Sequence, residues 1–229
     1  AALSASLYSS SDCCLHKYQK EILDKFNPNK ENRFLLTAST SFGKSFLIFE
    51  IIRKMNYKNV LLIYPTIALL SENLSKLLLD KKYIELKSKY SIHTISEIKK
   101  EDFGEFNIFI FTPERYLSFI DKYEHLLSFD FVFIDEIYKI DNGFEINDEE
   151  RENERDISYR MISFITAAKE KDILLAGPFL DNFKESFLYF LKRNRIIHLD
   201  YNAIEIVNKY FYKTENKQWI CSDDFEKIC

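Results

Sequence analysis

The chain has 229 residues, of which 46% are hydrophobic and 30% charged, and this allows one sizeable core, so we expect one large domain with tails. Its net charge of −4 excludes a global basic field of the kind that attracts nucleic acid, although a local groove could still be positive. The first residues are small and polar with no basic leader, and no apolar stretch reaches the roughly 18 residues of a membrane span, so we expect a soluble cytoplasmic protein.

The amino-terminal segment, residues 1–14, is interpreted as flexible. It contains Cys13 and Cys14, while Cys221 and Cys229 lie near the other end of the chain. This spacing matches neither a zinc knuckle nor a redox C-x-x-C motif, so we interpret all four cysteines as free thiols.

Apolar runs alternate along the chain with longer segments of helical periodicity. Strands are predicted at 33–37, 60–64, 107–111, 131–134 and 173–176, with weaker candidates at 91–95 and 195–199. Helices are predicted at 15–26, 45–55, 67–79, 113–120, 157–169 and 180–191. Continuous hydrophobicity is typical of strands that are covered on both faces. The pattern therefore predicts an α/β fold with a mostly parallel central sheet and helices on both faces.

The octet A-S-T-S-F-G-K-S, residues 38–45, follows the first predicted strand and leads into a predicted helix. It is a P-loop sequence in which Ala38 replaces the usual glycine, and strand–loop–helix is the context that the motif requires. Backbone N–H groups of such a loop bind phosphates. We therefore expect Lys44 to contact the β- and γ-phosphates of ATP and Ser45 to ligate Mg²⁺. Further nucleotide contacts are expected from Thr40, Ser41, Phe42 and Gly43.

A second nucleotide-binding element is the apolar run 129–134, which ends in Asp135 and Glu136. It has the form of a Walker B strand, which would place Asp135 at the metal and Glu136 beside the water that attacks the γ-phosphate. Taken alone, Gly-Lys-Ser can be a turn closing into a helix, and Asp-Glu can cap the next element. Together they predict ATP chemistry, with Lys44 and Glu136 as catalytic residues.

Each strong apolar run is followed by distinctive residues, and ligands of an open parallel sheet bind beyond the carboxyl ends of its strands. In chain order these are the P-loop, Pro65-Thr66, Thr112-Pro113-Glu114-Arg115, Asp135-Glu136-Ile137-Tyr138 and Gly177-Pro178. In this order the chain resembles the first RecA-like domain of superfamily 2 helicases of the DEAD-like group, over about residues 15–180. The resemblance implies a RecA-like P-loop NTPase domain, assigned here to residues 15–200, that couples ATP hydrolysis to movement on or unwinding of DNA or RNA.

The resemblance also implies roles for residues outside the P-loop. The segment L-H-K-Y-Q, residues 15–19, is similar to the Q motif, so Gln19 would hydrogen-bond to adenine. Residues 64–69 and 111–115 are similar to motifs Ia and Ib, so Thr66, Thr112 and Arg115 would contact one nucleic-acid strand. Hydroxyls and helix N-termini do bind phosphates. Thr-Pro is, however, also a good helix start, with threonine as N-cap.

Two departures from the family's pattern weaken the implication of unwinding. Ala176-Gly177-Pro178 replaces the Ser-Ala-Thr of motif III, whose hydroxyls are thought to link hydrolysis to strand movement. Tyr138 stands where the family has an Asp or His that faces the second domain. ATP binding is therefore implied more firmly than unwinding.

Residues 141–156 carry eight acidic residues against two arginines, which predicts a solvated mobile loop. Acidic mimicry of nucleic acid or a regulatory flap is the functional alternative. Residues 201–229 are interpreted as a linker toward a missing second RecA-like domain, from which the family takes its arginine finger. Because such an arginine finger raises the rate of hydrolysis by orders of magnitude, we expect these 229 residues to bind ATP–Mg²⁺ but to hydrolyse ATP slowly.

Three functions remain open at this point. The first is the ATP-binding part of a helicase or translocase, whose track could be DNA or RNA because backbone contacts do not distinguish them. The second is a P-loop phosphotransferase acting on a small molecule, against which the Q-motif match argues. The third is a nucleotide-gated protein-interaction module without unwinding activity. Stimulation of ATP hydrolysis by nucleic acid separates the first from both others.

Overall fold

The computed structural model describes residues 9–10, 13–15, 17–39, 42–123, 128–138, 154–178, 183–201, 210–213 and 219–222. At its centre is a seven-stranded sheet of order β5-β6-β4-β7-β8-β3-β9, in which every pairing is parallel. The strands are β3 (Arg33–Thr37), β4 (Asn59–Ile63), β5 (Ser91–His93), β6 (Asn107–Phe111), β7 (Phe131–Ile134), β8 (Asp172–Gly177) and β9 (Ile197–Asp200). The predicted fold class is confirmed, and the two weaker strand candidates form the two edges of the sheet.

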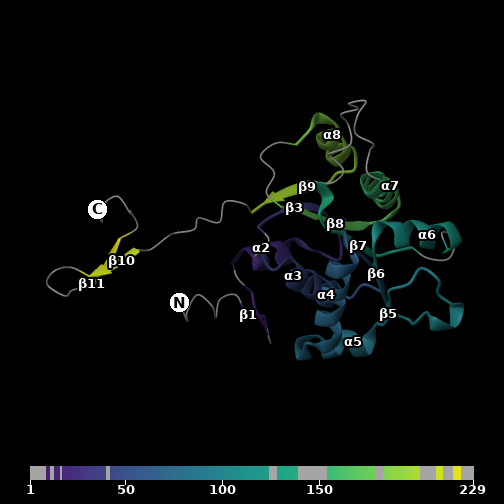
Figure 1. Ribbon diagram of the computed structural model, residues 1–229, viewed down its shortest axis with the longest axis horizontal. Coiled ribbons are helices and arrows are strands. Elements are labelled where there is room, and N and C mark those ends of the chain that lie inside the picture. The colour runs from purple at the N-terminus through teal and green to yellow at the C-terminus, as the bar shows by residue number, and fades with distance from the viewer. Residues whose placement is uncertain are drawn as a thin grey trace.

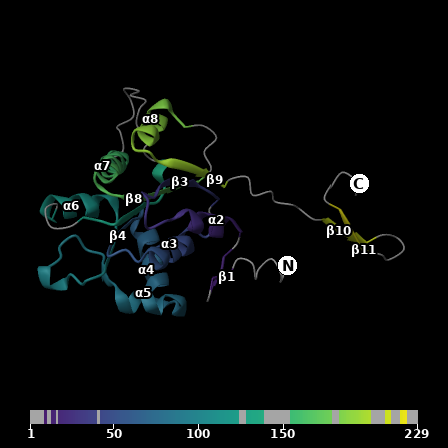
Figure 2. The same cartoon turned by 180° about the vertical axis from the view of Figure 1, so that it is seen from behind.

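Helices cover both faces of this sheet (Figures 1 and 2). One face carries α2 (Lys17–Lys25), α3 (Lys44–Met55), α4 (Ile67–Leu79) and α5 (Ile84–Lys89). The other carries α6 (Pro113–Tyr123), α7 (Glu154–Lys169) and α8 (Glu185–Arg193). Short 3-10 helices lie at Lys81–Tyr83 and Lys100–Asp102. No helix within the described residues has the length and apolar character that crossing a membrane requires.

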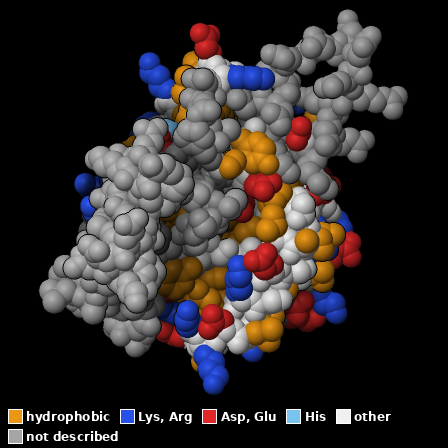
Figure 3. Space-filling model, turned by 60° about the vertical axis from the view of Figure 1, so that its left-hand side comes forward, with side chains coloured by type: hydrophobic (Ala, Val, Ile, Leu, Met, Phe, Trp, Pro, Cys, Tyr) orange, Lys and Arg blue, Asp and Glu red, His pale blue; other side chains and the backbone are white. Residues whose placement is uncertain are grey.

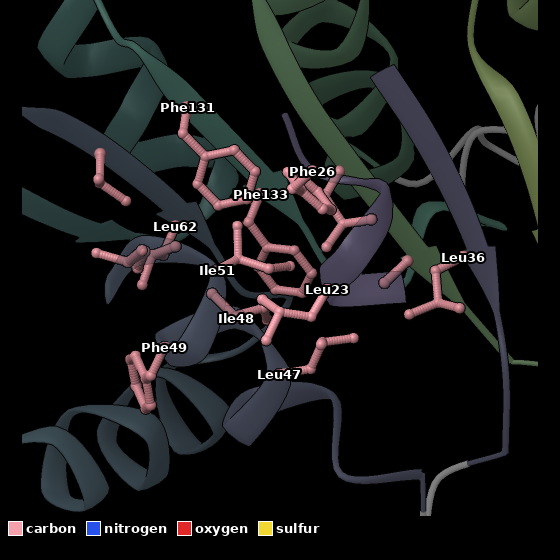
Figure 4. Packing of buried hydrophobic residues seen from close by; sticks show 14 of the residues in the cluster. Leu23, Phe26, Leu36, Leu47, Ile48, Phe49, Ile51, Leu62, Phe131 and Phe133 are labelled. Atoms are coloured by element: carbon pink, nitrogen blue, oxygen red, sulfur yellow. The ribbon is translucent and has the colours of Figure 1, made fainter. Parts of the chain in front are cut away.

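The core consists of two hydrophobic clusters, one on each face of the sheet. Side chains of a strand alternate between its faces, so Phe131 and Phe133 of β7 belong to one cluster while Val132 and Ile134 belong to the other. Figure 4 shows the first cluster, in which side chains of α2 and α3 pack beneath β7. Each fully buried large apolar side chain contributes roughly 1.5–3 kcal/mol, so this two-sided burial holds the strands together.

A buried carboxylate fastens the amino-terminal end of the sheet. Asp172, which is 2% exposed, accepts hydrogen bonds from the backbone N–H of Asn32 at 3.0 Å and from its side-chain Nδ2 at 2.7 Å. The Tyr57 hydroxyl donates to the same carboxylate at 2.5 Å. Burial and this carboxylate raise the pKa of Tyr57, so the phenol remains a donor. Asp172 thus ties the start of β8 to the start of β3 and to the loop before β4.

The guanidinium of Arg33 forms a second anchor at this end. It donates from Nε to the carbonyl of Asn194 at 2.8 Å, and from its terminal nitrogens to the carbonyls of Glu170 at 2.7 Å and Ala167 at 2.6 Å. The carboxyl ends of α7 and α8 are thereby held against the start of β3, which carries the P-loop at its other end.

Some predicted boundaries were wrong. Helix α7 begins at Glu154, within the predicted acidic loop; residues 141–153 of that loop lie outside the described residues. Helix α8 begins at Glu185 rather than at residue 180, and α5 was not predicted. Its Ile84–Lys89 stretch is short and rich in charge, so it has no extended apolar periodicity to recognise.

Short antiparallel strands occur toward both ends of the chain. β1 (Ser9–Ser10) pairs with β2 (Cys13–Cys14), within the segment predicted to be flexible. β10 (Tyr210–Lys213) pairs with β11 (Trp219–Ser222), within the segment predicted to be a linker. The interpretation of residues 201–229 as a linker to a second domain stays a prediction, and two short segments of it form paired strands.

We expect Asp172→Ala to lower the free energy of unfolding by about 2–4 kcal/mol, because the Asn32 and Tyr57 donors would be left buried without an acceptor. Chemical denaturation would measure the change. Asp121→Ala, at an exposed position of α6, is the matched control and should change stability by less than about 0.5 kcal/mol. Equal effects of the two substitutions would contradict the anchoring role of Asp172.

Candidate active site

The strand order brings three loops to one edge of the sheet. β8 lies between β7 and β3, so the residues after β8 separate the P-loop from Asp135 and Glu136. The backbone N–H of Ala38 donates to the carbonyl of Gly177 at 3.2 Å, which joins the start of the P-loop to the end of β8. The N–H of Asp135 donates to the carbonyl of Ile63 at 3.0 Å, which joins β7 to the end of β4. The predicted phosphate and metal residues therefore converge.

Gly43 closes the P-loop and begins helix α3. Its φ of +78° lies in the left-handed region, which glycine adopts without strain, and its carbonyl accepts the N–H of Leu47 at 3.1 Å. A Cβ at this position would lie 2.7 Å from Nε2 of Gln19, so a larger residue would require the Gln19 side chain to move. Of the other predicted loop contacts, Phe42 is buried, whereas Thr40 and Ser41 lie outside the described residues.

Gln19 supports the P-loop from helix α2. Its side chain is 5% exposed, and its amide donates to the carbonyl of Phe42 at 2.8 Å. The structure therefore brings Gln19 to the loop, as expected for a residue of the nucleotide site. Its contact with adenine stays a prediction, and the observed contact shows a structural role that the sequence motif did not reveal.

Lys44 is held by the loop that it belongs to. Its ammonium group donates to the carbonyls of Ala38 and Ser39, each at 3.2 Å. Burial lowers the pKa of Lys44, while the carboxylates of Asp135 and Glu136 act in the opposite direction. A partly buried lysine whose partners are two neutral carbonyls is well suited to exchange them for an anion.

Asp135 and Glu136 lie in a tight turn directly after β7. The Asp135 carboxylate accepts the N–H of Glu136 at 3.0 Å, and Glu136 has a φ of +54°, which is uncommon for a residue with a side chain. Burial raises the pKa of Asp135 to about 6, and the charge of Lys44 opposes this rise. A carboxylate of raised pKa that lines a pocket is a candidate functional group.

These residues line a pocket of about 660 Å³ that runs from the P-loop along the groove between α3 and α4. A pocket of this size accommodates a small-molecule ligand. Lys44, Ser45, Asp135, Glu136 and Tyr138 all contribute to its wall. Among the described residues, no three His, Cys, Asp or Glu side chains form a metal-binding group. A single carboxylate with the Ser45 hydroxyl fits Mg²⁺, which retains waters and phosphate oxygens as ligands.

The predicted nucleic-acid contacts also lie at the carboxyl edge, beyond β4 and β6. The Thr66 hydroxyl caps α4 by accepting the N–H of Leu69 at 3.2 Å, and the Thr112 hydroxyl accepts the N–H of Arg115 at 3.4 Å. The guanidinium of Arg115 donates to the carbonyl of Thr94 at 2.9 Å. All three side chains thus have local structural roles, and their contact with nucleic acid stays a prediction. On the face shown in Figure 3, acidic and basic side chains are interspersed.

Tyr201 is a residue near the P-loop that the sequence analysis missed. Its N–H donates to the carbonyl of Thr37 at 2.9 Å, and its ring centroid lies 5.4 Å from that of Tyr18 and 6.0 Å from that of Phe42. Because Tyr201 follows β9 directly, the rule that ligands bind beyond the carboxyl ends of strands could have identified it. It was missed because the strand itself was only a weak candidate.

Comparison with known proteins gives consistent results. The family model for DEAD/DEAH box helicases matches residues 16–173. Among curated proteins, anti-bacteriophage protein B of Escherichia coli K12 is 24% identical over 200 residues, which cover 86% of this chain and 25% of that protein.

Several solved structures share the fold. The DEAD-box helicase Mss116 bound to ssRNA and UDP-BeF has a TM-score of 0.55 at 17% identity, covering 82% of this chain and 40% of its own. The Hef helicase domain of Pyrococcus furiosus has a TM-score of 0.56 at 15% identity, and the match covers 86% of this chain and 40% of the Hef chain. The UvsW helicase of bacteriophage T4 has a TM-score of 0.53 at 18% identity, and the match covers 84% of this chain and 62% of the UvsW chain. The chain thus spans about a quarter of the curated relative and about two fifths of the first two structures.

The raised pKa of Asp135 predicts a pH dependence of stability. Because the pKa is about 6 in the folded chain against an ordinary value of 3.8, the folded state binds more protons here between these values. The stability that Asp135 contributes relative to Asn should therefore be greatest below about pH 4 and fall by roughly 1–3 kcal/mol as the pH rises through about 6.

The measurement is the difference in free energy of unfolding between the wild type and Asp135→Asn in metal-free buffer, taken from about pH 4 to about pH 7. A difference that stays constant or grows with pH would show that Asp135 is not a buried acid of raised pKa.

Proposed function

Because the chain belongs to the DEAD/DEAH box helicase family, we propose that it is the ATP-binding part of a superfamily 2 helicase or translocase that couples ATP hydrolysis to movement on, or unwinding of, DNA or RNA. The family and the RecA-like fold agree with the resemblance drawn from the motifs. The observation that carries the proposal is that Lys44, Ser45, Asp135 and Glu136, from two distant parts of the sequence, line one pocket.

Nucleotide binding would begin at the start of α3. The helix N-terminus at Gly43 favours negative charge, and the backbone N–H groups of a P-loop would bind the phosphates there. Lys44 would exchange the carbonyls of Ala38 and Ser39 for phosphate oxygens. A phosphate oxygen carries negative charge that a carbonyl oxygen lacks, so the exchange would add a charge–charge attraction to the hydrogen bond.

The hydrolytic step would depend on Glu136. Its position after Asp135, at the wall of the same pocket, suits a carboxylate that orients the attacking water. Ser45 and Asp135 would hold Mg²⁺, which when bound neutralises charge on the phosphate oxygens. Burial disfavours the charged form of Asp135 and so raises its pKa. A bound cation would stabilise that charged form and offset the effect of burial.

Nucleic acid would bind beyond β4 and β6, at the same edge of the sheet as the phosphate pocket. Helices α4 and α6 both begin at this edge. The hydroxyls of Thr66 and Thr112, which precede them, accept backbone N–H groups and retain protons that can be donated to phosphates. Arg115 would release the carbonyl of Thr94 to reach the same strand. Contacts of this kind position a nucleic acid without reading its sequence.

A second RecA-like domain would complete the enzyme. The chain covers only 40% of the Mss116 and Hef structures and 25% of the curated relative, which leaves room for such a domain in those proteins. Because charge stabilisation would come from the second domain, we expect the present chain alone to hydrolyse ATP slowly. The name of the curated relative also makes bacteriophage nucleic acid worth including among the polymers tested.

One set of observations favours a second candidate, a nucleotide-gated protein-interaction module without unwinding activity. The predicted nucleic-acid contacts are engaged in helix caps and in a hydrogen bond to Thr94, and Ala176-Gly177-Pro178 lacks the hydroxyls of motif III. The two candidates share the ATP site and differ only in what nucleotide binding controls.

We expect the full-length protein to hydrolyse ATP faster in the presence of single-stranded or duplex DNA or RNA. Glu136→Gln should retain nucleotide binding and lower kcat by at least about 100-fold, and Lys44→Ala should weaken nucleotide binding, because each removes a group that contacts the reacting phosphate. Steady-state hydrolysis with each polymer, together with binding of a fluorescent ATP analogue, measures both effects.

Lys87→Ala is the control for Lys44→Ala, because Lys87 lies on α5 at an exposed position. Hydrolysis that no polymer stimulates would favour the interaction module. Normal turnover by Glu136→Gln would reject the assigned catalytic role.

A further inference from the structure

Tyr138 contacts the carboxylate proposed to orient the attacking water. Its hydroxyl donates to Oε2 of Glu136 across 3.4 Å, and both side chains line the pocket that contains Lys44 and Ser45. We propose that Tyr138 is a positioning residue that holds the Glu136 carboxylate in the orientation needed for hydrolysis. This inference rests on the proposed function, because it assigns Tyr138 a task only if Glu136 orients water.

The backbone between the two residues is firmly fixed. Ile137 is fully buried in the cluster that contains Ile134 and Leu175, so the turn after β7 is anchored in the core. Glu136 has a φ of +54°, and its N–H is bound to the Asp135 carboxylate. With the intervening side chain buried, the side chains of Glu136 and Tyr138 both face the pocket.

A fixed backbone does not by itself fix the carboxylate. A glutamate has three rotatable side-chain bonds, so the orientation of its carboxylate depends on the groups that it contacts. The Tyr138 hydroxyl is an uncharged donor, so its hydrogen bond can hold the carboxylate without neutralising it. A carboxylate accepts several hydrogen bonds, so the contact with Tyr138 leaves capacity for a water.

Tyr138 is suited to be that donor. Burial and the Glu136 charge raise the pKa of its hydroxyl, so it carries its proton throughout the physiological range. Its ring is partly buried at the wall of the pocket, which restricts where the hydroxyl can move. The 3.4 Å distance is long for a hydrogen bond, and catalytic hydrogen bonds of nucleotide-free enzymes commonly shorten in the substrate complex.

The test is Tyr138→Phe in the full-length protein, which removes the hydroxyl and keeps the ring. We expect kcat for ATP to fall about three- to tenfold, with KM and the affinity for a non-hydrolysable ATP analogue unchanged, as for loss of a hydrogen bond that acts in the transition state. Tyr189→Phe is the matched control, because Tyr189 is 64% exposed on α8, and it should leave kcat unchanged.

A second measurement distinguishes positioning from a general structural effect. In a Glu136→Gln background, single-turnover hydrolysis should not fall further when Tyr138→Phe is added, because the group that Tyr138 positions has been replaced. Additive losses would overturn the proposal, as would a Tyr138→Phe protein with unchanged or increased kcat, or with a raised KM alone.

The two proposals fail in different ways. If Glu136→Gln hydrolyses ATP normally, the proposed role of Glu136 is wrong, and the role of Tyr138 falls with it. If Glu136→Gln is inactive while Tyr138→Phe behaves as the wild type, the proposed function stands and the positioning role of Tyr138 is rejected.

Discussion

The carboxyl ends of β3, β8 and β7 meet at one edge because these strands are hydrogen-bonded in parallel and buried on both faces. Two residues that are 91 positions apart, Lys44 and Asp135, reach the same pocket only through this arrangement. The opposite ends of the same strands are fixed by Asp172 and Arg33. The buried polar anchors and the candidate site thus lie at opposite ends of one rigid unit, so the site can carry a costly carboxylate and a left-handed glutamate without loss of order.

The strong apolar runs predicted the strands well because a strand that is buried on both faces must be continuously apolar. β3, β6 and β7 begin and end where the sequence indicated. The extent of β8 was underestimated because it begins at Asp172, a charged residue that becomes part of the sheet through its hydrogen bonds to Asn32 and Tyr57. Partners so distant in sequence leave no local pattern, and no periodicity could have revealed them.

The residue types of the candidate site were predictable, but their contacts were not. Gly43 could be assigned to a phosphate-binding loop from spacing alone, whereas its close approach to Gln19 depends on how α2 packs. For Thr66 the residue type leaves two roles open, helix capping and phosphate binding, and the structure shows the helix cap. The contact between Tyr138 and Glu136 required the turn geometry, since both residues lie beyond the end of β7, where strand periodicity no longer predicts the direction of a side chain.

In this structure the ammonium group of Lys44 is bound by carbonyl oxygens of its own loop, where the proposed function places phosphate oxygens. With the carbonyls of Ala38 and Ser39 as acceptors, its ammonium group is hydrogen-bonded before any nucleotide arrives. In the proposed function, nucleotide binding would exchange these acceptors rather than make new bonds, so the affinity would reflect the difference in charge between phosphate and carbonyl rather than the full interaction energy. The same carbonyls can take the lysine back when the nucleotide leaves. A loop whose carbonyls compete with the proposed ligand for the same lysine would favour release of the nucleotide after each turnover.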